Sequence, residues 1–428
     1  MSLPGAPFLA RVGTQLQLEG HSLAELAQQF GTPLYVYSRA AMLGALSHYQ
    51  RALHGRRHLI CYAMKANSNL AVLQTFVDAG CGLDIVSGGE LERALAVGVA
   101  PEKIVFSGVG KTQAEMRQAL AANVLCFNVE SSAELDTLSR VASSMGQRAK
   151  VSLRVNPDVD AGTHPYISTG LKGNKFGVAH RDAVATYTRA AALPGIEVVG
   201  IDCHIGSQIM HIAPYIDALD RLLDLVEQVE ATGVILQHVD IGGGLGITYA
   251  DETPPAADEL VSRVLQRMDE RGHGHRELLL EPGRSLVGNA GVMLTEVINL
   301  KRGETKNFCI VDAAMNDLVR PAMYQAWLGI EACVQRDETG EPSTWDVVGP
   351  VCESGDWLGR DRALAVQPGD ILALLSAGAY AMAMASNYNT RPRGAEVLLD
   401  GRHAHLVRER EVARALFAGE HMLPRAEA

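Results

Sequence analysis

Residues 59–66 read Leu-Ile-Cys-Tyr-Ala-Met-Lys-Ala, a short apolar run that closes on a single lysine. The length and composition of this run are typical of a buried β-strand. A turn and a stretch with helical periodicity follow it, and the same succession recurs as far as residue 283. The sequence therefore predicts a domain built from repeated β-α units.

Eight such apolar runs can be counted, at residues 59–66, 82–87, 104–107, 124–130, 150–156, 198–206, 236–242 and 277–283. Helices are expected between them, at 89–97, 114–121, 133–144, 183–192 and 218–231. Eight units over roughly 225 residues match a (β/α)8 barrel, and we assign residues 34–283 to it. A doubly wound open sheet remains the alternative, because a count of strands does not show that the sheet closes.

The pattern changes after residue 284. Strand-like segments now follow one another without helices, at 293–300, 308–312, 345–352, 371–377 and 397–407. The last contains Asp400-Gly401, a hairpin signal between two apolar runs. Residues 284–428 therefore predict a mostly β domain, and the N-terminal segment 1–33 is expected to join it.

Composition excludes several classes of protein. The chain has 428 residues, a net charge of −11 and 47% hydrophobic residues. A binder of nucleic acid would carry a basic face, which an acidic chain does not favour. The first residues resemble no signal peptide, and the longest apolar stretch, 371–385, is too short to span a bilayer. We expect a cytoplasmic protein.

The seven cysteines include no Cys-x-x-Cys pair. Five lie in or beside apolar runs and are expected to be buried thiols in a reducing compartment: Cys61, Cys81, Cys126, Cys203 and Cys309. Cys352 instead lies in Val348-Gly-Pro-Val-Cys-Glu-Ser-Gly-Asp356, a polar loop flanked by glycines. That setting suits a reactive thiol better than a core residue.

Polar residues of the barrel fall where its apolar strands end. They are Lys65, Asp84, Ser107, Asn128, Arg154, His204, Gly242–Gly244 and Glu281. In a parallel barrel those ends form one rim, and active sites are built on that rim. The coincidence predicts an active site there.

Lys65 and a glycine-rich turn suggest the chemistry. A poorly solvated lysine has a lowered pKa and can form a Schiff base, although a surface lysine at a strand end is the commoner case. The turn Asp240-Ile-Gly-Gly-Gly-Leu-Gly246 follows the seventh strand, where barrels commonly bind phosphate. A lysine and a phosphate site together suggest a phosphorylated aldehyde cofactor.

The eighth strand ends in Glu281-Pro-Gly-Arg284. A carboxylate facing a pyridine nitrogen keeps that nitrogen protonated and makes the ring a stronger electron sink. His204 is compatible with stacking on such a ring or with a place in the core, and the residues leave both open.

Taken together, seven stretches resemble the fold-type III decarboxylases that depend on pyridoxal 5′-phosphate, and within them the branch that acts on meso-diaminopimelate. The stretches, in family order, are YAMKAN (62–67), HIGSQI (204–209), GGGLGI (242–247), EPGR (281–284), NDLVRPAMY (316–324), GPVCESGD (349–356) and GAYAMAMASNYNTRPRGAEV (378–397). The family fold is an alanine-racemase-like barrel with a β domain. This agrees with the domains predicted above.

The resemblance implies a role for each site residue. Lys65 would form the Schiff base and His204 would stack on the ring, while Cys352 would donate a proton. The cofactor would be held by Lys65, His204, Ser207, Gly244, Glu281, Pro282, Gly283, Arg284 and Tyr380. The substrate would be bound by Arg284, Arg320, Tyr324, Glu353 and Tyr380. Because Cys352 and Glu353 would act from a second subunit, a homodimer is implied.

The charges favour one substrate. An arginine on the leaving carboxylate would stabilise the ground state more than the transition state, so Arg284 and Arg320 need another carboxylate. meso-2,6-Diaminopimelate supplies one, with an ammonium for Glu353, and its decarboxylation gives L-lysine and CO2. Ornithine, arginine or a D-amino acid stay open as substrates. A racemase is disfavoured, because Glu281 would strengthen the electron sink more than racemisation needs.

Overall fold

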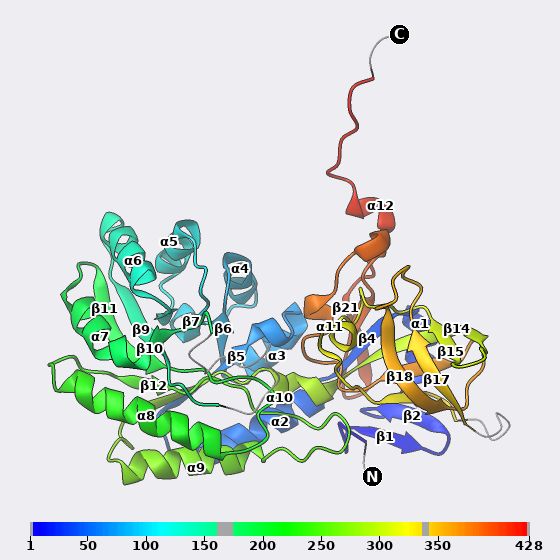
Figure 1. Ribbon diagram of the computed structural model, residues 1–428, viewed down its shortest axis with the longest axis horizontal. Coiled ribbons are helices and arrows are strands. Elements are labelled where there is room, and N and C mark those ends of the chain that lie inside the picture. The colour runs from blue at the N-terminus through cyan, green and yellow to red at the C-terminus, as the bar shows by residue number, and fades with distance from the viewer. Residues whose placement is uncertain (1–2, 161–173, 336–341, 426–428) are drawn as a thin grey trace. The chain divides into compact units, whose positions relative to one another are not determined.

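The computed structural model describes residues 3–160, 174–335 and 342–425. The chain divides into two compact units (Figure 1). One unit is Ala41–Gly288, and the other combines Met1–Ala40 with Asn289–Ala428. Each is described by itself below.

The unit Ala41–Gly288 is a closed parallel barrel. Its eight strands are β5 (His58–Ala63), β6 (Gly82–Ile85), β7 (Ile104–Phe106), β8 (Cys126–Val129), β9 (Ala149–Asn156), β11 (Ile196–Asp202), β12 (His238–Asp240) and β13 (Glu277–Leu280). The strand β8 pairs with both β7 and β9, and β13 pairs with β5, so the ring is complete. The barrel prediction is confirmed, and the open sheet is excluded. A short strand, β10 (Val178–Ala179), extends the sheet beside β9.

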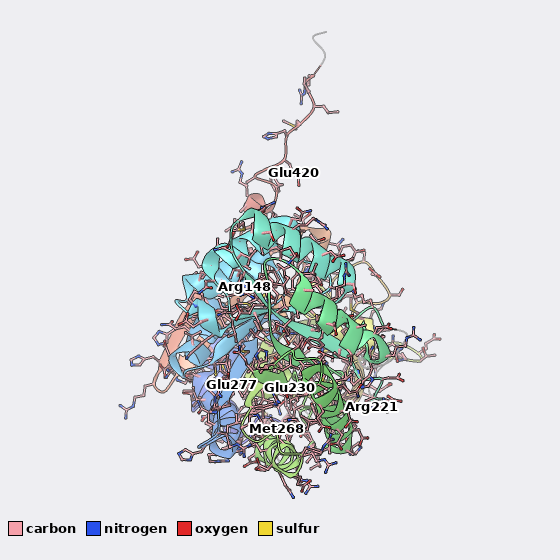
Figure 2. The ribbon with its side chains drawn as sticks, turned by 90° about the vertical axis from the view of Figure 1, so that its left-hand side faces the viewer. Arg148, Arg221, Glu230, Met268, Glu277 and Glu420 are labelled. Atoms are coloured by element: carbon pink, nitrogen blue, oxygen red, sulfur yellow. The ribbon has the colours of Figure 1, made fainter. Side chains whose placement is uncertain are left out.

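Helices surround the strands, as Figure 2 shows with Glu230, the last residue of α8 (Ala213–Glu230), and Met268 in α9 (Ala257–Glu270). The five predicted helices are present as α4 (Gly88–Ala96), α5 (Gln113–Ala122), α6 (Ser132–Ser144), α7 (Ala183–Ala192) and α8 (Ala213–Glu230). The structure adds α2 (Arg39–Ala52), α3 (Leu70–Asp78), α9 (Ala257–Glu270) and the short α10 (Arg284–Val287). No described helix is long and apolar enough to cross a membrane.

Local sequence explains why these helices begin where they do. Thr112 and Glu115 form a capping box at the start of α5, and the side chain of Ser131 caps α6. In α8 the buried residues Leu219, Leu222 and Leu223 recur at helical spacing, so one face of the helix packs on the barrel.

The predicted burial of five cysteines is confirmed: Cys61, Cys81, Cys126, Cys203 and Cys309 are all buried, and Cys333 is buried as well. Cys61 and Cys126 pack with Val105, Val199 and Leu279 in one apolar cluster of the barrel. The strands are buried on both faces because helices cover the outside and side chains fill the inside.

The second unit is mostly β. Its main sheet contains β4 (Leu34–Ser38), β14 (Gly291–Lys301), β15 (Phe308–Val311), β16 (Ile330–Ala332), β17 (Ser343–Val348), β18 (Trp357–Leu364), β19 (Ile371–Leu374), β20 (Ala395–Asp400) and β21 (His403–Arg408). The predicted hairpin at Asp400-Gly401 is confirmed, since β20 and β21 are antiparallel neighbours and Gly401 has φ 58°.

The N-terminal segment belongs to this β unit. It folds into β1 (Leu9–Val12), β2 (Gln15–Leu18), β3 (His21–Ser22) and α1 (Leu23–Phe30). Leu16 and Leu18 share a buried core with Val292 and Val397.

Strand β4 belongs to the β unit, whereas the domain boundary predicted from the sequence placed residues 34–38 in the barrel. It pairs antiparallel with β14 and parallel with β20. All five residues of β4 are buried, so the segment looks like any core strand. Only its partners, far away in the chain, place it in the β unit.

Candidate active site

The carboxyl ends of the eight parallel strands carry the polar residues of the barrel. Lys65 follows β5 in a single turn of 3-10 helix (Met64–Ala66), and its side chain remains 36% exposed. Its Nζ donates a hydrogen bond to Oδ2 of Asp84, which is fully buried in β6. Lys65 is thus reachable from solvent while a fixed anion holds its amine in position.

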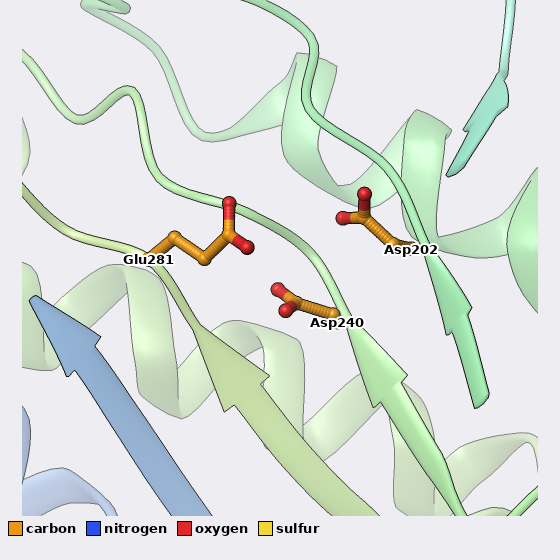
Figure 3. A group of neighbouring side chains, drawn as sticks. All are labelled: Asp202, Asp240 and Glu281. Atoms are coloured by element: carbon orange, nitrogen blue, oxygen red, sulfur yellow. The ribbon is translucent and has the colours of Figure 1, made fainter. Parts of the chain in front are cut away.

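Three acidic side chains converge beside this pair. Asp202 ends β11, Asp240 ends β12, and Glu281 follows β13. All three are buried, and one carboxylate oxygen from each lies within 4.8 Å of those from the other two. Figure 3 shows the carboxylates pointing toward one another from neighbouring strands.

Glu281 is held by neutral donors. The Ser107 hydroxyl donates to its Oε1 at 3.4 Å, and the Asn128 amide donates to the same oxygen at 3.3 Å. Burial raises the pKa of Glu281 well above its usual range, and the nearby Asp240 and Asp84 raise it further. A cation placed against Glu281 would be strongly favoured.

The glycine-rich turn after β12 is packed against its neighbours. A Cβ on Gly243 would lie 2.1 Å from the carbonyl oxygen of Glu281. A Cβ on Gly244, whose φ is +102°, would lie 2.3 Å from the carbonyl oxygen of Gly206. Glycine is required at both positions, so backbone amides rather than side chains line this turn.

His204 has intermediate exposure and contacts the same turn. Its Nδ1 accepts a hydrogen bond from the Gly243 N–H at 3.2 Å. Burial lowers the pKa of His204 well below its usual value, and the cations Arg154 and Lys65 lower it further. The ring is therefore neutral and carries its proton on Nε2.

The residues after β13 join the site to Lys65. The carbonyl of Pro282 accepts a hydrogen bond from the Ala63 N–H at 3.1 Å, and a Cβ on Gly283 would lie 3.1 Å from Cβ of Ala63. The buried Arg284 donates to the hydroxyls of Ser207, at 2.9 Å, and Tyr249.

The structure thus places the predicted barrel residues, Lys65, His204, Ser207, Gly244, Glu281, Pro282, Gly283 and Arg284, on the strand ends and loops of one rim. Asp202, Asp240 and Tyr249 also belong to this site, but the sequence interpretation did not assign them roles. The two aspartates end strands as Glu281 does, so the strand-end rule contained the signal.

The other predicted residues lie in the β unit. Arg320 is buried and begins α11 (Arg320–Tyr324), and Tyr324 ends that helix. Tyr380 has a positive φ of 54°.

Cys352 and Glu353 are exposed in the loop between β17 and β18. A hydrogen bond from Tyr388 to Glu353 raises the pKa of the Tyr388 hydroxyl. Cys352 is the exception among the cysteines, since the other six are buried. Its accessibility fits a thiol that takes part in chemistry.

Pyridoxal 5′-phosphate fits the barrel rim. Lys65 offers a partly exposed amine for its aldehyde, and the buried acids around Glu281, which form no ion pair with the described residues, suit a protonated ring nitrogen. The glycine turn, in which side chains are excluded, suits a phosphate.

Comparisons with known proteins agree with this fit. Residues 39–288 match the family model described as "Pyridoxal-dependent decarboxylase, pyridoxal binding domain". The chain is 56% identical to the diaminopimelate decarboxylase of Pseudomonas aeruginosa, with 96% of this chain and 98% of the relative covered. It is 55% identical to that of Vibrio cholerae, covering 96% and 97%.

Solved structures give the same result. The diaminopimelate decarboxylase of "m. jannaschii", in co-complex with L-lysine, has a TM-score of 0.93 at 38% identity, with 98% of this chain and 99% of that chain covered. The enzyme of Helicobacter pylori, complexed with L-lysine, has a TM-score of 0.88 at 41% identity, with 92% and 98% covered.

Proposed function

The chain belongs to the diaminopimelate decarboxylases, within the pyridoxal-dependent decarboxylase family, and we propose on this premise that it converts meso-2,6-diaminopimelate to L-lysine and CO2. The observation that carries the proposal is the rim of the barrel, where the Lys65–Asp84 pair lies beside the buried acids around Glu281. Two relatives of known structure are complexed with L-lysine, the expected product.

The cofactor is pyridoxal 5′-phosphate, which when bound supplies the sink for the electrons left at Cα as CO2 departs. Lys65 would hold it covalently. Gly244, Ser207, Tyr380 and the residues 281–284 would bind its polar groups, with Glu281 as the partner of the ring nitrogen. His204 would contact the ring as a neutral imidazole, so it would add no positive charge that competes with the ring nitrogen for Glu281.

The remaining residues bind the substrate and move its proton. Arg284, Arg320, Tyr324 and Tyr380 contact the substrate, with the arginines reserved for the distal carboxylate because a clamp on the leaving carboxylate would oppose its loss. Glu353 accepts the distal ammonium. The Cys352 thiol delivers a proton to Cα after CO2 has left, which its exposed loop allows.

Release of CO2 from several amino acids tests this proposal. We expect the purified protein with added cofactor to decarboxylate meso-diaminopimelate at least roughly 100-fold more efficiently, in kcat/KM, than L-ornithine, L-arginine or L-lysine. The reason is that only the first has both a distal carboxylate and a distal ammonium, and one such charge-assisted contact is worth about 3 kcal/mol. Equal or greater efficiency with ornithine or arginine would contradict the substrate assignment.

We further propose that the enzyme is a cytoplasmic homodimer without a nucleic-acid partner, in which Cys352 and Glu353 serve the site of the other subunit. The net charge of −11 supports the absence of a nucleic-acid partner. The exposure of both residues supports their availability to a second copy.

Subunit mixing tests the shared site. Lys65→Ala and Cys352→Ala are each expected to be nearly inactive alone. After dissociation and reassociation together they should recover about a quarter of wild-type activity, because half of the dimers are mixed and each mixed dimer has one intact site. A mixture of wild-type and Lys65→Ala subunits, treated in the same way, is the control for losses on reassociation. If subunits exchange and no activity returns, both groups act within one chain.

A further inference from the structure

The charges inside the barrel do not balance. Lys65 forms an ion pair with Asp84, and Arg154 forms one with Glu130 at 3.1 Å. These two cations are thereby matched by two acids. The carboxyl groups of Asp202, Asp240 and Glu281, described above, form no ion pair with any of the described residues.

Two oxygens in this group also lack a hydrogen-bond donor. Oδ1 of Asp240 accepts the Gly242 N–H at 2.8 Å. Its Oδ2, and Oδ1 of Asp202, are buried and receive no hydrogen bond from any described group. A buried carboxylate oxygen without a donor is costly, and neighbouring anions repel each other. A proton shared between two of the carboxyls removes both costs.

We propose that Asp240 and Glu281 share a proton, and that Asp240 is a positioning residue for Glu281. In the cofactor-free protein the proton lies between Oδ2 of Asp240 and the carboxylate of Glu281. When a protonated ring nitrogen lies against Glu281, the shared proton is bonded to Asp240. Asp240 then donates a hydrogen bond to Glu281, and the negative charge stays on Glu281. The second step rests on the proposed function, and the first does not.

The titratable and charged groups that act on this pair lie at neighbouring strand ends: Cys61, Lys65, Asp84, Cys126, Arg154, Asp202 and Cys203. The Asn128 amide donates a hydrogen bond to Glu281, and His204 contacts Gly243 in the turn after Asp240. Burial raises the pKa of the three thiols well above the ordinary range, so they stay neutral. His204 is neutral as described above. The three thiols and His204 therefore do not titrate near neutral pH, whereas burial, with Asp84 adding to it, raises the pKa of Asp240 to about 7.

The pH dependence of stability tests the shared proton without the cofactor. An acid whose pKa is raised in the folded state favours folding below its unfolded pKa, near 4, and loses that contribution as the pH rises through its folded pKa. For Asp240, with a pKa of about 7, the folding equilibrium constant should fall roughly tenfold between pH 6 and pH 8. Asp240→Asn keeps the acceptor for Gly242 and an N–H for Glu281 but does not titrate, so this tenfold fall should disappear.

Urea unfolding of the full-length cofactor-free chain at pH 6 and 8, at one protein concentration, provides the measurement. Asp224→Asn is the matched control, since it removes an exposed carboxylate, 55% accessible, from the same unit. The wild type and the control should show the fall, whereas Asp240→Asn should not. Equal pH dependence in all three proteins would overturn the proposal. So would a stoichiometric bound metal, or a pH dependence abolished by a chelator, because the carboxylates would then be ligands.

A second measurement on the holoenzyme separates positioning from packing. Asp240→Leu fills the space but can neither accept from Gly242 nor donate to Glu281. We expect its kcat to be at least roughly tenfold below that of Asp240→Asn, with KM changed less than about threefold. Equal kcat values in two folded variants would contradict the positioning role. The stability measurement needs no turnover, so it stands even if the reaction assigned here is wrong.

Discussion

Replacing Lys65 with alanine is expected to lower kcat/KM for decarboxylation by roughly 10³- to 10⁴-fold, a loss of about 4–5.5 kcal/mol of transition-state stabilisation. The variant loses the amine that holds the cofactor covalently. Without this link, the folded variant should also bind the cofactor more weakly. The fully buried Asp84 would lose its cationic partner, which should lower the stability of the folded variant.

The colour of the protein and labelling with borohydride show which lysine holds the cofactor. The wild-type protein should be yellow, and borohydride should fix the cofactor to the peptide that contains Lys65. Lys103→Ala is the matched control, because Lys103 directly precedes β7, at the amino end of that strand, and its Nζ donates a hydrogen bond to the Gly80 carbonyl, so it has no role in the site. A label on another lysine, or a colourless wild-type protein that stays without cofactor when it is added, would show that Lys65 is not the attachment point.

Replacing Arg320 with methionine is expected to lower kcat/KM for meso-diaminopimelate by roughly 30- to 1000-fold. The proposed contact with the distal carboxylate is charge-assisted, and Arg320 is buried, so the contact is worth about 2–4 kcal/mol. Decarboxylation of a substrate with a distal amine alone should be unchanged or slightly faster, because a repelling cation is removed. Arg320→Lys should recover only part of the loss, since an ammonium cannot reproduce the planar fork.

Steady-state kinetics with both kinds of substrate provide the measurement. Arg362→Met is a suitable control, because Arg362 is another buried arginine of the β unit and stacks on Trp327. It tests whether loss of any buried arginine reduces activity. If Arg320→Met slows every substrate equally, Arg320 supports the cofactor or the fold and does not select the distal carboxylate.

Much of the fold could be predicted because it rests on local patterns. Each barrel strand is a short apolar run with a polar residue at its end, as in β5 followed by Lys65. The hairpin at Asp400-Gly401 and the burial of Cys61 follow from their immediate neighbours in the chain. Such features need no knowledge of distant partners.

Other features depended on distant partners. Strand β4 has an apolar sequence that fits either unit, and its pairing with β14 and β20 places it in the β unit. The sequence also left His204 between two interpretations. The hydrogen bond from the Gly243 N–H, on a different strand end, fixes the tautomer of its ring.

The sequence by itself determined the barrel, the family and the residue types at the rim, because these follow from periodicity and from ordered motifs. Only the tertiary structure decided that Asp202, Asp240 and Glu281 form one buried group, and none of the three makes an ion pair within the part of the chain that the structure describes. Each of these residues ends or follows one of three neighbouring strands, β11, β12 and β13, and the pairing of these strands brings one carboxylate oxygen from each residue within 4.8 Å of the others. Their proton affinities arise from burial and mutual repulsion, which are properties of positions in space and not of neighbours in the chain.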